Sequence, residues 1–177
     1  MTEKLYVLED MRIRPPHPGD GPTVFRLIKE CDPLDVNSRY CNLLQTFHFR
    51  DTSCAVECPN GELWGFISGY MVPNSDNTLF IWQVAVSPKA RGMGLGKAMI
   101  MDILTRGYED IHNIHTTITE DNGPSWGMFA SLARDLGGAK MSNRLLFDSE
   151  KHFAGRHDNE IILELGPFSL RENTYEE

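Results

Sequence analysis

A glycine-rich segment with two basic residues points most directly to chemistry. It runs Arg91-Gly-Met-Gly-Leu-Gly-Lys97, between an apolar stretch that ends at Val86 and a stretch with apolar residues at helical spacing. Glycines remove Cβ atoms where an anion must approach the backbone, and the first amides of a helix are donors that its dipole reinforces. Arg91 and Lys97 add positive charge to a chain whose formal net charge is -8. The segment therefore predicts a pyrophosphate site.

Two common phosphate-binding motifs do not fit this segment. A Walker loop (Gly-x-x-x-x-Gly-Lys-Ser/Thr) that ends on Gly96-Lys97 would begin at Arg91 and finish at Ala98. A dinucleotide fingerprint that starts at Gly92 needs a glycine at position 97, where lysine stands. The residues fit Arg-x-x-Gly-x-Gly instead, and an ordinary glycine-rich connection is the structural alternative.

The pattern Arg91-x-x-Gly94-x-Gly96, preceded by Val86-x-Pro88, resembles the coenzyme A pyrophosphate loop of the GCN5-related N-acetyltransferases. The strand with Trp-Gly-Phe-Ile at 64–67 and the Asn122-x-x-Ser125 segment are also similar to that family, over roughly residues 12–165. The resemblance implies a single-domain α/β fold and acetyl-CoA as cosubstrate. It also implies that acetyl-CoA is held by the main chain of Val84 and Val86, and by Arg91, Gly92, Gly94, Gly96, Lys97 and Asn122.

Three further segments (residues 31–49, 80–86 and 153–160) resemble the branch of that family that acetylates L-2,4-diaminobutyrate at its 4-amino group in ectoine biosynthesis. This substrate carries two ammonium groups and one carboxylate, so its pocket should offer carboxylates and neutral donors. The resemblance implies that the substrate is bound by Asp32, Asp35, Asn37, Ser38 and Trp82. It further implies catalytic roles for Glu160, His157 and Tyr40.

Each of these residues also has a purely structural interpretation. Asp35, Asn37 or Ser38 could cap a helix, and Asp32 before Pro33 is a common turn pair. Tyr40 and Trp82 could be core aromatics, and His157-Asp158-Asn159 could be a solvated turn. Two other functions remain open, namely acetylation of another small amine such as a polyamine or an aminoglycoside, and a catalytically silent acyl-CoA sensor.

Proton handling departs from the pattern of the resembled family. Many members place a tyrosine seven residues after the asparagine that matches Asn122, and this tyrosine protonates the departing thiolate. Position 129 is phenylalanine here, so that role is vacant. Glu160, with His157, is the candidate for accepting the amine proton, and Tyr40 is the candidate for donating one to sulfur.

The elements that must position these residues follow the order β-α-α-β-β-β-α-β-α-β-β, which predicts a mixed, largely antiparallel twisted sheet flanked by helices. We expect strands at 13–18, 54–57, 63–72, 79–86, 112–119, 145–147 and 160–165, and helices at 20–31, 38–47, 94–106 and 123–136. Asp20 should cap the first helix. The second helix should bury Tyr40, Leu43, Leu44 and Phe47.

Composition limits the class of protein. A chain of 177 residues predicts one domain, here 12–166, with terminal extensions 1–11 and 167–177. The excess of acidic residues argues against a nucleic acid partner and suits a cationic small molecule. We see no apolar run long enough for a membrane span or a signal peptide, so we expect a cytoplasmic protein. Four cysteines, without zinc-site spacing, predict free thiols and no metal, and the family resemblance implies a homodimer.

Overall fold

A computed structural model describes residues 11–106 and 110–170, which fall into two compact units. The first unit contains residues 11–71 and 80–106, and the second contains residues 72–79 and 110–170. Most of the two predicted terminal extensions therefore lies outside the described residues. No helix in the described ranges is long and apolar enough to span a membrane.

The first unit holds the elements that carry the glycine-rich segment and the predicted substrate residues. They are β1 (Arg12–Arg14), α2 (Gly21–Glu30), α3 (Arg39–Phe47), β2 (Cys54–Glu57), β3 (Leu63–Met71), β4 (Thr78–Val86, whose first two residues belong to the second unit) and α4 (Leu95–Leu104). Short 3-10 turns, η1 (Pro18–Asp20), η2 (Arg50–Thr52) and η3 (Pro88–Ala90), lie between them. The strands are neighbours in the order β1-β2-β3-β4.

Helices cover both faces of the β2–β3 pair. The antiparallel register places Ala55 opposite Phe66 and Val56 opposite Gly65. Successive side chains of a strand point to opposite faces, so these two pairs face different layers. A Cβ added at Gly65 would lie 2.9 Å from Cε of Met99 on α4, so this side of the pair is the α4 face and the helix approaches the strand closely at this glycine.

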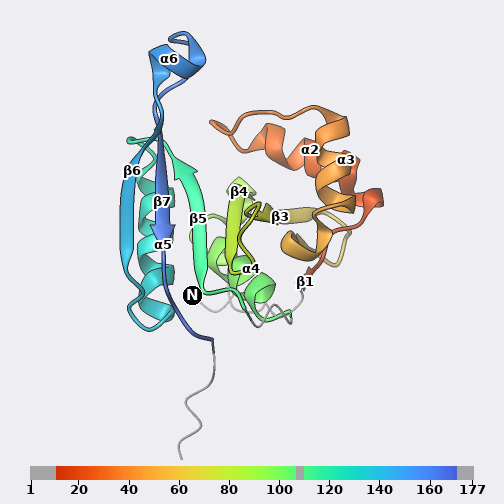
Figure 1. The fold of residues 1–177 in the computed structure, drawn as a ribbon. Helices are drawn as coiled ribbons and strands as arrows, with labels where there is room; N and C mark the ends of the chain where they lie inside the picture. Colours follow the sequence, from red (N-terminus) through yellow and green to blue (C-terminus); the bar gives the residue numbers. More distant parts are fainter. Residues whose placement is uncertain (1–10, 107–109, 171–177) are drawn as a thin grey trace, which may run out of the picture. The chain divides into compact units, whose positions relative to one another are not determined.

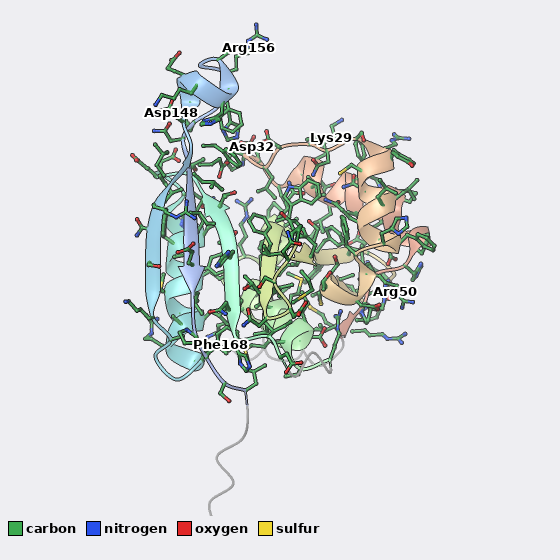
Figure 2. The ribbon with its side chains drawn as sticks, in the orientation of Figure 1. Lys29, Asp32, Arg50, Asp148, Arg156 and Phe168 are labelled. Carbon is green, nitrogen blue, oxygen red and sulfur yellow. The ribbon has the colours of Figure 1, made fainter. Side chains whose placement is uncertain are left out.

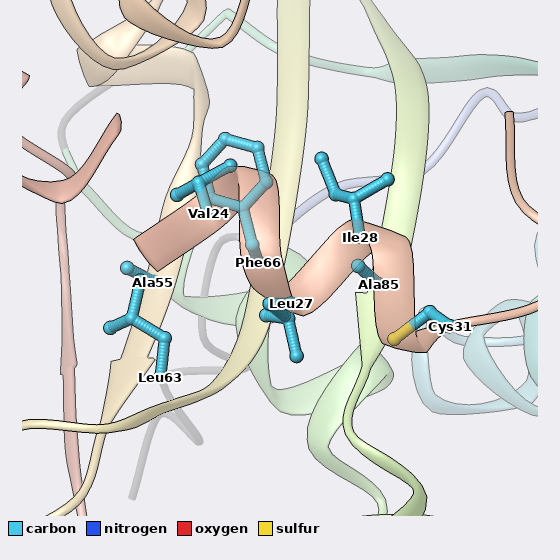
Figure 3. Packing of buried hydrophobic residues seen from close by; sticks show 8 residues of the cluster. All are labelled: Val24, Leu27, Ile28, Cys31, Ala55, Leu63, Phe66 and Ala85. Atoms are coloured by element: carbon cyan, nitrogen blue, oxygen red, sulfur yellow. The ribbon is translucent and has the colours of Figure 1, made fainter. Parts of the chain in front are cut away.

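The other face of the pair is covered by α2. Val24, Leu27 and Ile28 of this helix form a buried cluster (Figure 3) with Cys31, Ala55, Leu63, Phe66 and Ala85. The apolar spacing that predicted the helix is thus the stripe that packs on the sheet. Burial of side chains of this size contributes roughly 2 kcal/mol each. The cluster holds the end of α2, where the predicted substrate loop begins, against β4.

The predicted cap of α2 is wrong. Asp20 precedes the helix, but its side chain makes no capping hydrogen bond to it. Its carboxylate accepts instead from the Arg14 guanidinium at 2.7 and 2.9 Å and from the backbone N–H of His17 at 2.9 Å. A buried carboxylate needs a partner of opposite charge, and Arg14 meets this need better than a single helix amide.

The helix α3 turns its polar side inward, which is the reverse of the prediction. Of the four residues predicted to be buried, Leu44 is only partly covered and the others are exposed: Tyr40 70%, Leu43 40% and Phe47 60%. The buried side chains are Asn42, Gln45 and Thr46. Figure 1 shows α3 beside α2.

Hydrogen bonds explain why this polar side is buried. Asn42 donates to Gln45 at 3.0 Å, and Gln45 donates to Ser68 Oγ on β3 at 3.4 Å. The Thr46 hydroxyl donates to the carbonyl of Leu43 at 3.0 Å. A buried amide is tolerated when it is hydrogen-bonded, so this chain of contacts fixes which side of α3 faces the sheet.

The second unit contains β5 (Asn113–Ile118), α5 (Gly123–Asp135), β6 (Met141–Phe147), α6 (Ser149–Phe153) and β7 (Glu160–Leu165). The strands are neighbours in the order β5-β7-β6, and both pairs are antiparallel. The sequence predicted β7 with its observed bounds but gave only the last three residues of β6. It missed α6, which projects beyond the ends of β6 and β7 (Figure 1). A five-residue helix is too short to show apolar periodicity.

Candidate functional site

The glycine-rich segment has the backbone that its sequence predicts. Gly92 and Gly94 have φ angles of +77° and +80°, which side chains rarely adopt, and Gly94 is the N-cap of α4. A glycine cap offers no side chain to the first amides of the helix, so they stay available as donors. A Cβ at either glycine would meet nothing within 4 Å, so open space adjoins the segment. These features fit an anion.

Basic groups lie on both sides of these glycines. Arg91 is exposed, and its Nη2 donates to the backbone carbonyl of Asp32 at 3.4 Å. Gly96 is buried in the first turn of α4, and Lys97 beside it is half-buried. The segment is thus linked to the loop of residues 31–38, which we call the acceptor loop and which follows α2 (Figure 2 labels Asp32).

The strand β4 is tied to the acceptor loop at two further places. The thiol of Cys31 donates to the carbonyl of Val86 at 3.3 Å, and burial raises the pKa of this thiol, which keeps the donor protonated. Gln83 donates through Nε2 to the carbonyl of Asp35 at 3.0 Å. The first unit therefore brings the acceptor loop, β4 and the glycine-rich segment together. Val84 and Val86 are half-buried on that strand.

Two predicted substrate residues have structural tasks. Ser38 caps α3, because its Oγ accepts from the N–H of Cys41 at 3.1 Å. Asn37 donates through Nδ2 to Oε1 of Gln83 at 3.1 Å. The cap that the sequence offered as an alternative is present at Ser38, while Asn37 holds the loop to β4. An amide or a hydroxyl can form further bonds, so neither task prevents a contact with a ligand.

The aromatic residues Tyr40 and Trp82 do not belong to the core. Tyr40 is 70% exposed on α3, and Trp82 is 42% exposed on β4. Large aromatic side chains usually gain most from burial, so their exposure on the elements that flank the acceptor loop leaves them accessible to a ligand. The interpretation of both as core aromatics is wrong.

In the second unit, Asn122 lies where α5 begins. Its Oδ1 accepts from the N–H of Ser125 at 3.2 Å, so Asn122 is the N-cap of this helix. The spacing Asn122-x-x-Ser125 therefore has a local structural cause. Phe129, on the same helix, is 2% exposed and packs in the core of the second unit.

The second unit also brings His157 and Glu160 together. His157 Nε2 lies 3.7 Å from Glu160 Oε1, and the two side chains are 30% and 18% exposed. The other ring nitrogen, Nδ1, lies 2.9 Å from the carbonyl oxygen of Asp158. A carbonyl only accepts, so this contact requires a proton on Nδ1, and Nε2 is the ring nitrogen that faces Glu160. Protonation at Nε2 would then create an ion pair with Glu160.

Local contacts hold the segment that carries His157 in place. Ser149 at the start of α6 donates from Oγ to the carbonyl of His157 at 2.6 Å, and the ring of Phe153 lies against the imidazole with centroids 4.7 Å apart. Asp148 caps α6 by accepting from Lys151 N at 2.9 Å (Figure 2 labels Asp148 and Arg156, which flank α6). The short helix that sequence reasoning missed therefore supports the segment that carries His157.

Gln83 on β4 contacts the acceptor loop, and the sequence analysis did not assign it a role. It is 9% exposed and lies in an otherwise apolar run, Phe80–Val86. A lone amide in such a run is a signal, because a buried polar side chain requires partners.

One pocket in the first unit contains none of the predicted site residues. Its volume is about 400 Å³, and it is lined by Thr23, Arg26, Leu27, Glu30, Asn60, Gly61, Glu62, Leu63, Trp64, Ser87 and Lys89. Its charges are partly paired internally, since Lys89 bonds Glu62 at 3.2 Å. Within 11–106 and 110–170, no group of three or more His, Cys, Asp or Glu is arranged to hold a metal.

Known proteins match the chain over most of its length. Residues 22–133 match the acetyltransferase (GNAT) family. The L-2,4-diaminobutyric acid acetyltransferase of Methylotuvimicrobium alcaliphilum is 48% identical over 149 residues, which are 84% of this chain and 86% of the relative. The enzyme of the same name from Halomonas elongata is 43% identical over 157 residues, 88% of this chain and 81% of the relative.

Solved structures of similar fold include an enzyme with the same activity in its name. The diaminobutyrate acetyltransferase of Paenibacillus lautus, in complex with its substrate L-2,4-diaminobutyric acid and coenzyme A, is 31% identical and superimposes with a TM-score of 0.84. The match covers 92% of this chain and 98% of that one. Ard1 from Thermoplasma volcanium, at 18% identity and a TM-score of 0.70, shares the fold. The predicted single-domain α/β fold is confirmed.

Proposed function

Because the chain belongs to the GNAT acetyltransferase family, we propose that it transfers the acetyl group of acetyl-CoA to the 4-amino group of L-2,4-diaminobutyrate. The match to the Paenibacillus lautus enzyme, which was solved with this amino acid and coenzyme A, carries the proposal. In the reaction, the neutral 4-amine forms a bond to the thioester carbon and the carbon–sulfur bond breaks. The products are N4-acetyl-L-2,4-diaminobutyrate and the thiol of coenzyme A, and the amine gives up one proton.

The glycine-rich segment is the proposed pyrophosphate site. The amides at the start of α4 and the positive charges of Arg91 and Lys97 suit two phosphates, and the glycine cap keeps side chains out of the way. The main chain of Val84 and Val86 would hold the pantetheine arm. A backbone amide of β4 would face the thioester oxygen, where negative charge develops. Asn122 is proposed to contact coenzyme A from the start of α5.

The acceptor loop supplies groups of the right charge for a diamino acid. Asp32 and Asp35 offer carboxylates for the α-ammonium, and the remaining N–H of Asn37 and the Ser38 hydroxyl suit the α-carboxylate. Trp82 offers an exposed aromatic wall on β4. Anchoring both α-groups leaves the 4-amine as the group that reaches the thioester, which gives regiochemistry through positioning.

Glu160 and His157 are proposed to take the proton from the 4-ammonium. A carboxylate both attracts the ammonium and accepts its proton, and His157 Nε2, 3.7 Å away, can store a proton as an ion pair with Glu160. Tyr40 is the proposed donor to sulfur, since Phe129 has no hydroxyl.

Thiol release tests the proposed function. The purified protein with acetyl-CoA should release thiol only when L-2,4-diaminobutyrate is added, and NMR should show the acetyl group on N4. Faster release with polyamines or aminoglycosides would assign it to another small amine. Binding of acetyl-CoA without release for any of these amines would make it a sensor.

We further propose that the enzyme is a cytoplasmic homodimer that serves osmoprotection. Acetyl-CoA is a cytoplasmic metabolite, and the relatives that carry the diaminobutyrate name support the physiological role. The exposed apolar side chains of α3 are of the kind that oligomer contacts cover. Sedimentation at several concentrations should give twice the chain mass of 20.1 kDa, and a monomer throughout would exclude the dimer.

A further inference from the structure

Gln83 lies between two residues with proposed contacts to the reactants. Trp82 precedes it on β4, and Val84 follows it. Neighbouring side chains on a strand point to opposite faces. Trp82 is 42% exposed, whereas the side chain of Gln83 turns inward and is 9% exposed. The amide of Gln83 therefore forms its hydrogen bonds with protein groups and not with solvent.

Both ends of this amide bind the acceptor loop. Nε2 donates to the carbonyl of Asp35 at 3.0 Å, and Oε1 accepts from Nδ2 of Asn37 at 3.1 Å. Only one orientation of the amide satisfies both contacts, because the Asp35 carbonyl cannot donate. A single side chain thus fixes two points of the loop, two residues apart, to the strand.

We propose that Gln83 is a positioning residue for acetyl transfer, which sets the distance between the acceptor loop and β4. The inference rests on the proposed function, in which the loop holds the amine and β4 holds the thioester. Reaction between two bound groups depends steeply on their separation, and an error of 1 Å can cost about 100-fold in rate. Gln83 touches neither reactant in this scheme and acts through Asp35 and Asn37.

The test replaces Gln83 by methionine, which keeps the length of the side chain but makes neither hydrogen bond. We expect kcat for diaminobutyrate to fall by roughly 10- to 100-fold while the Kd for coenzyme A, measured by calorimetry, stays within about twofold of wild type. Thr52→Val is the matched control, because it removes a buried hydroxyl contact to β3, from Thr52 Oγ1 to the carbonyl of Gly69 at 2.7 Å, that does not reach the loop. Its kcat should equal that of wild type even if its melting temperature falls.

A double substitution identifies the route of the effect. Asn37→Ala removes one of the two ties from the loop side and should lower kcat, and it also removes the proposed contact with the α-carboxylate, which raises KM. In the Gln83→Met background the same change should lower kcat little further, since the tie is already lost, while the rise in KM persists. Losses in kcat that multiply would mean that the two side chains act independently and would overturn the proposal.

The outcomes separate this proposal from the proposed function. Wild-type kcat in a folded Gln83→Met protein would overturn the positioning role and leave the assigned reaction intact. A large rise in KM for diaminobutyrate with unchanged kcat would also overturn it, because the residue would then serve binding alone. No thiol release by the wild-type protein with diaminobutyrate would overturn both.

Discussion

Replacement of Glu160 by glutamine removes the proposed proton acceptor and keeps the shape of the side chain. Glu160 opens β7 and is 18% exposed, with His157 Nε2 3.7 Å from its Oε1. Glutamine can still accept a hydrogen bond from an ammonium group, but it cannot take the proton. The variant should therefore depend on amine that is already neutral when it binds.

The size of the loss follows from the fraction of neutral amine in solution. With an amine pKa of about 10.4, as for a lysine side chain, about 1 molecule in 250 is neutral near pH 8, and about 1 in 4 near pH 10. If supplying neutral amine is the task of Glu160, turnover of Glu160→Gln with diaminobutyrate well below its KM should fall by about 250-fold near pH 8 and only by about 4-fold near pH 10. The loss near pH 8 lies within the range of about 10²- to 10⁴-fold for general base catalysis.

Thiol release with acetyl-CoA in excess, measured at several pH values, gives the ratio of wild-type to variant turnover. Glu164→Gln is the matched control, because it lies on the same strand and its carboxylate pairs with Arg144 at 3.4 Å, outside the proposed site. This control should keep wild-type turnover at every pH.

Two results would refute the reasoning. A ratio that stays constant from pH 7 to 10 would mean that Glu160 does not supply neutral amine. A KM for diaminobutyrate that Glu160→Gln raises by the same factor at every pH, with wild-type kcat, would show a binding group, and bulk water would then take the proton.

Three further predictions concern the coenzyme, stability and thiol reactivity. Gly94→Val places a β-branched residue at φ +80° and should abolish coenzyme A binding in calorimetry, and wild-type affinity would reject the pyrophosphate site. Asp20→Asn should lower the free energy of unfolding by about 2 kcal/mol, since Arg14 keeps Glu57 as a second partner. The control Asp51→Asn, which breaks the exposed pair with Arg50, should lower it by under about 0.5 kcal/mol. Burial raises the pKa of Asp20, but the bonds from Arg14 outweigh it, so this pKa is lowered. The stabilisation by Asp20 is therefore present above the unfolded pKa and is lost as pH falls through the folded pKa. The melting temperatures of wild type and Asp20→Asn should converge in acid, and a difference that does not change with pH would contradict this. Burial raises the pKa of Cys54 to about 12, so this thiol should resist labelling near pH 8 until the protein unfolds, and rapid labelling of the native protein would contradict its burial.

The order of elements could be predicted because most elements follow simple periodicity. The bounds of β2 and β7 match the prediction, and α2, α4 and α5 differ from it by a few residues. Periodicity distinguishes the two sides of a helix, but it does not say which side is buried. In α3 the polar residues Asn42, Gln45 and Thr46 have the same helical spacing as the apolar ones, and only the tertiary bond to Ser68 decides between them.

The candidate site could be predicted in part from the sequence. Positive φ at Gly92 and Gly94 follows from glycine chemistry, so the glycine-rich segment could be located without a structure. The task of Gln83 could not, because it depends on a contact with residues 48 and 46 positions earlier in the chain. Long-range hydrogen bonds leave no local pattern beyond the unexpected amide in an apolar run.

The ties that hold the acceptor loop have a consequence for engineering. Arg91 and Gln83 donate to the main-chain carbonyls of Asp32 and Asp35, not to their carboxylates. Any residue type carries such a carbonyl, so these anchors do not specify the side chains at positions 32 and 35. Libraries randomised at these two positions should therefore keep a docked loop, which makes them the natural place to redesign the enzyme for amines of different charge or length.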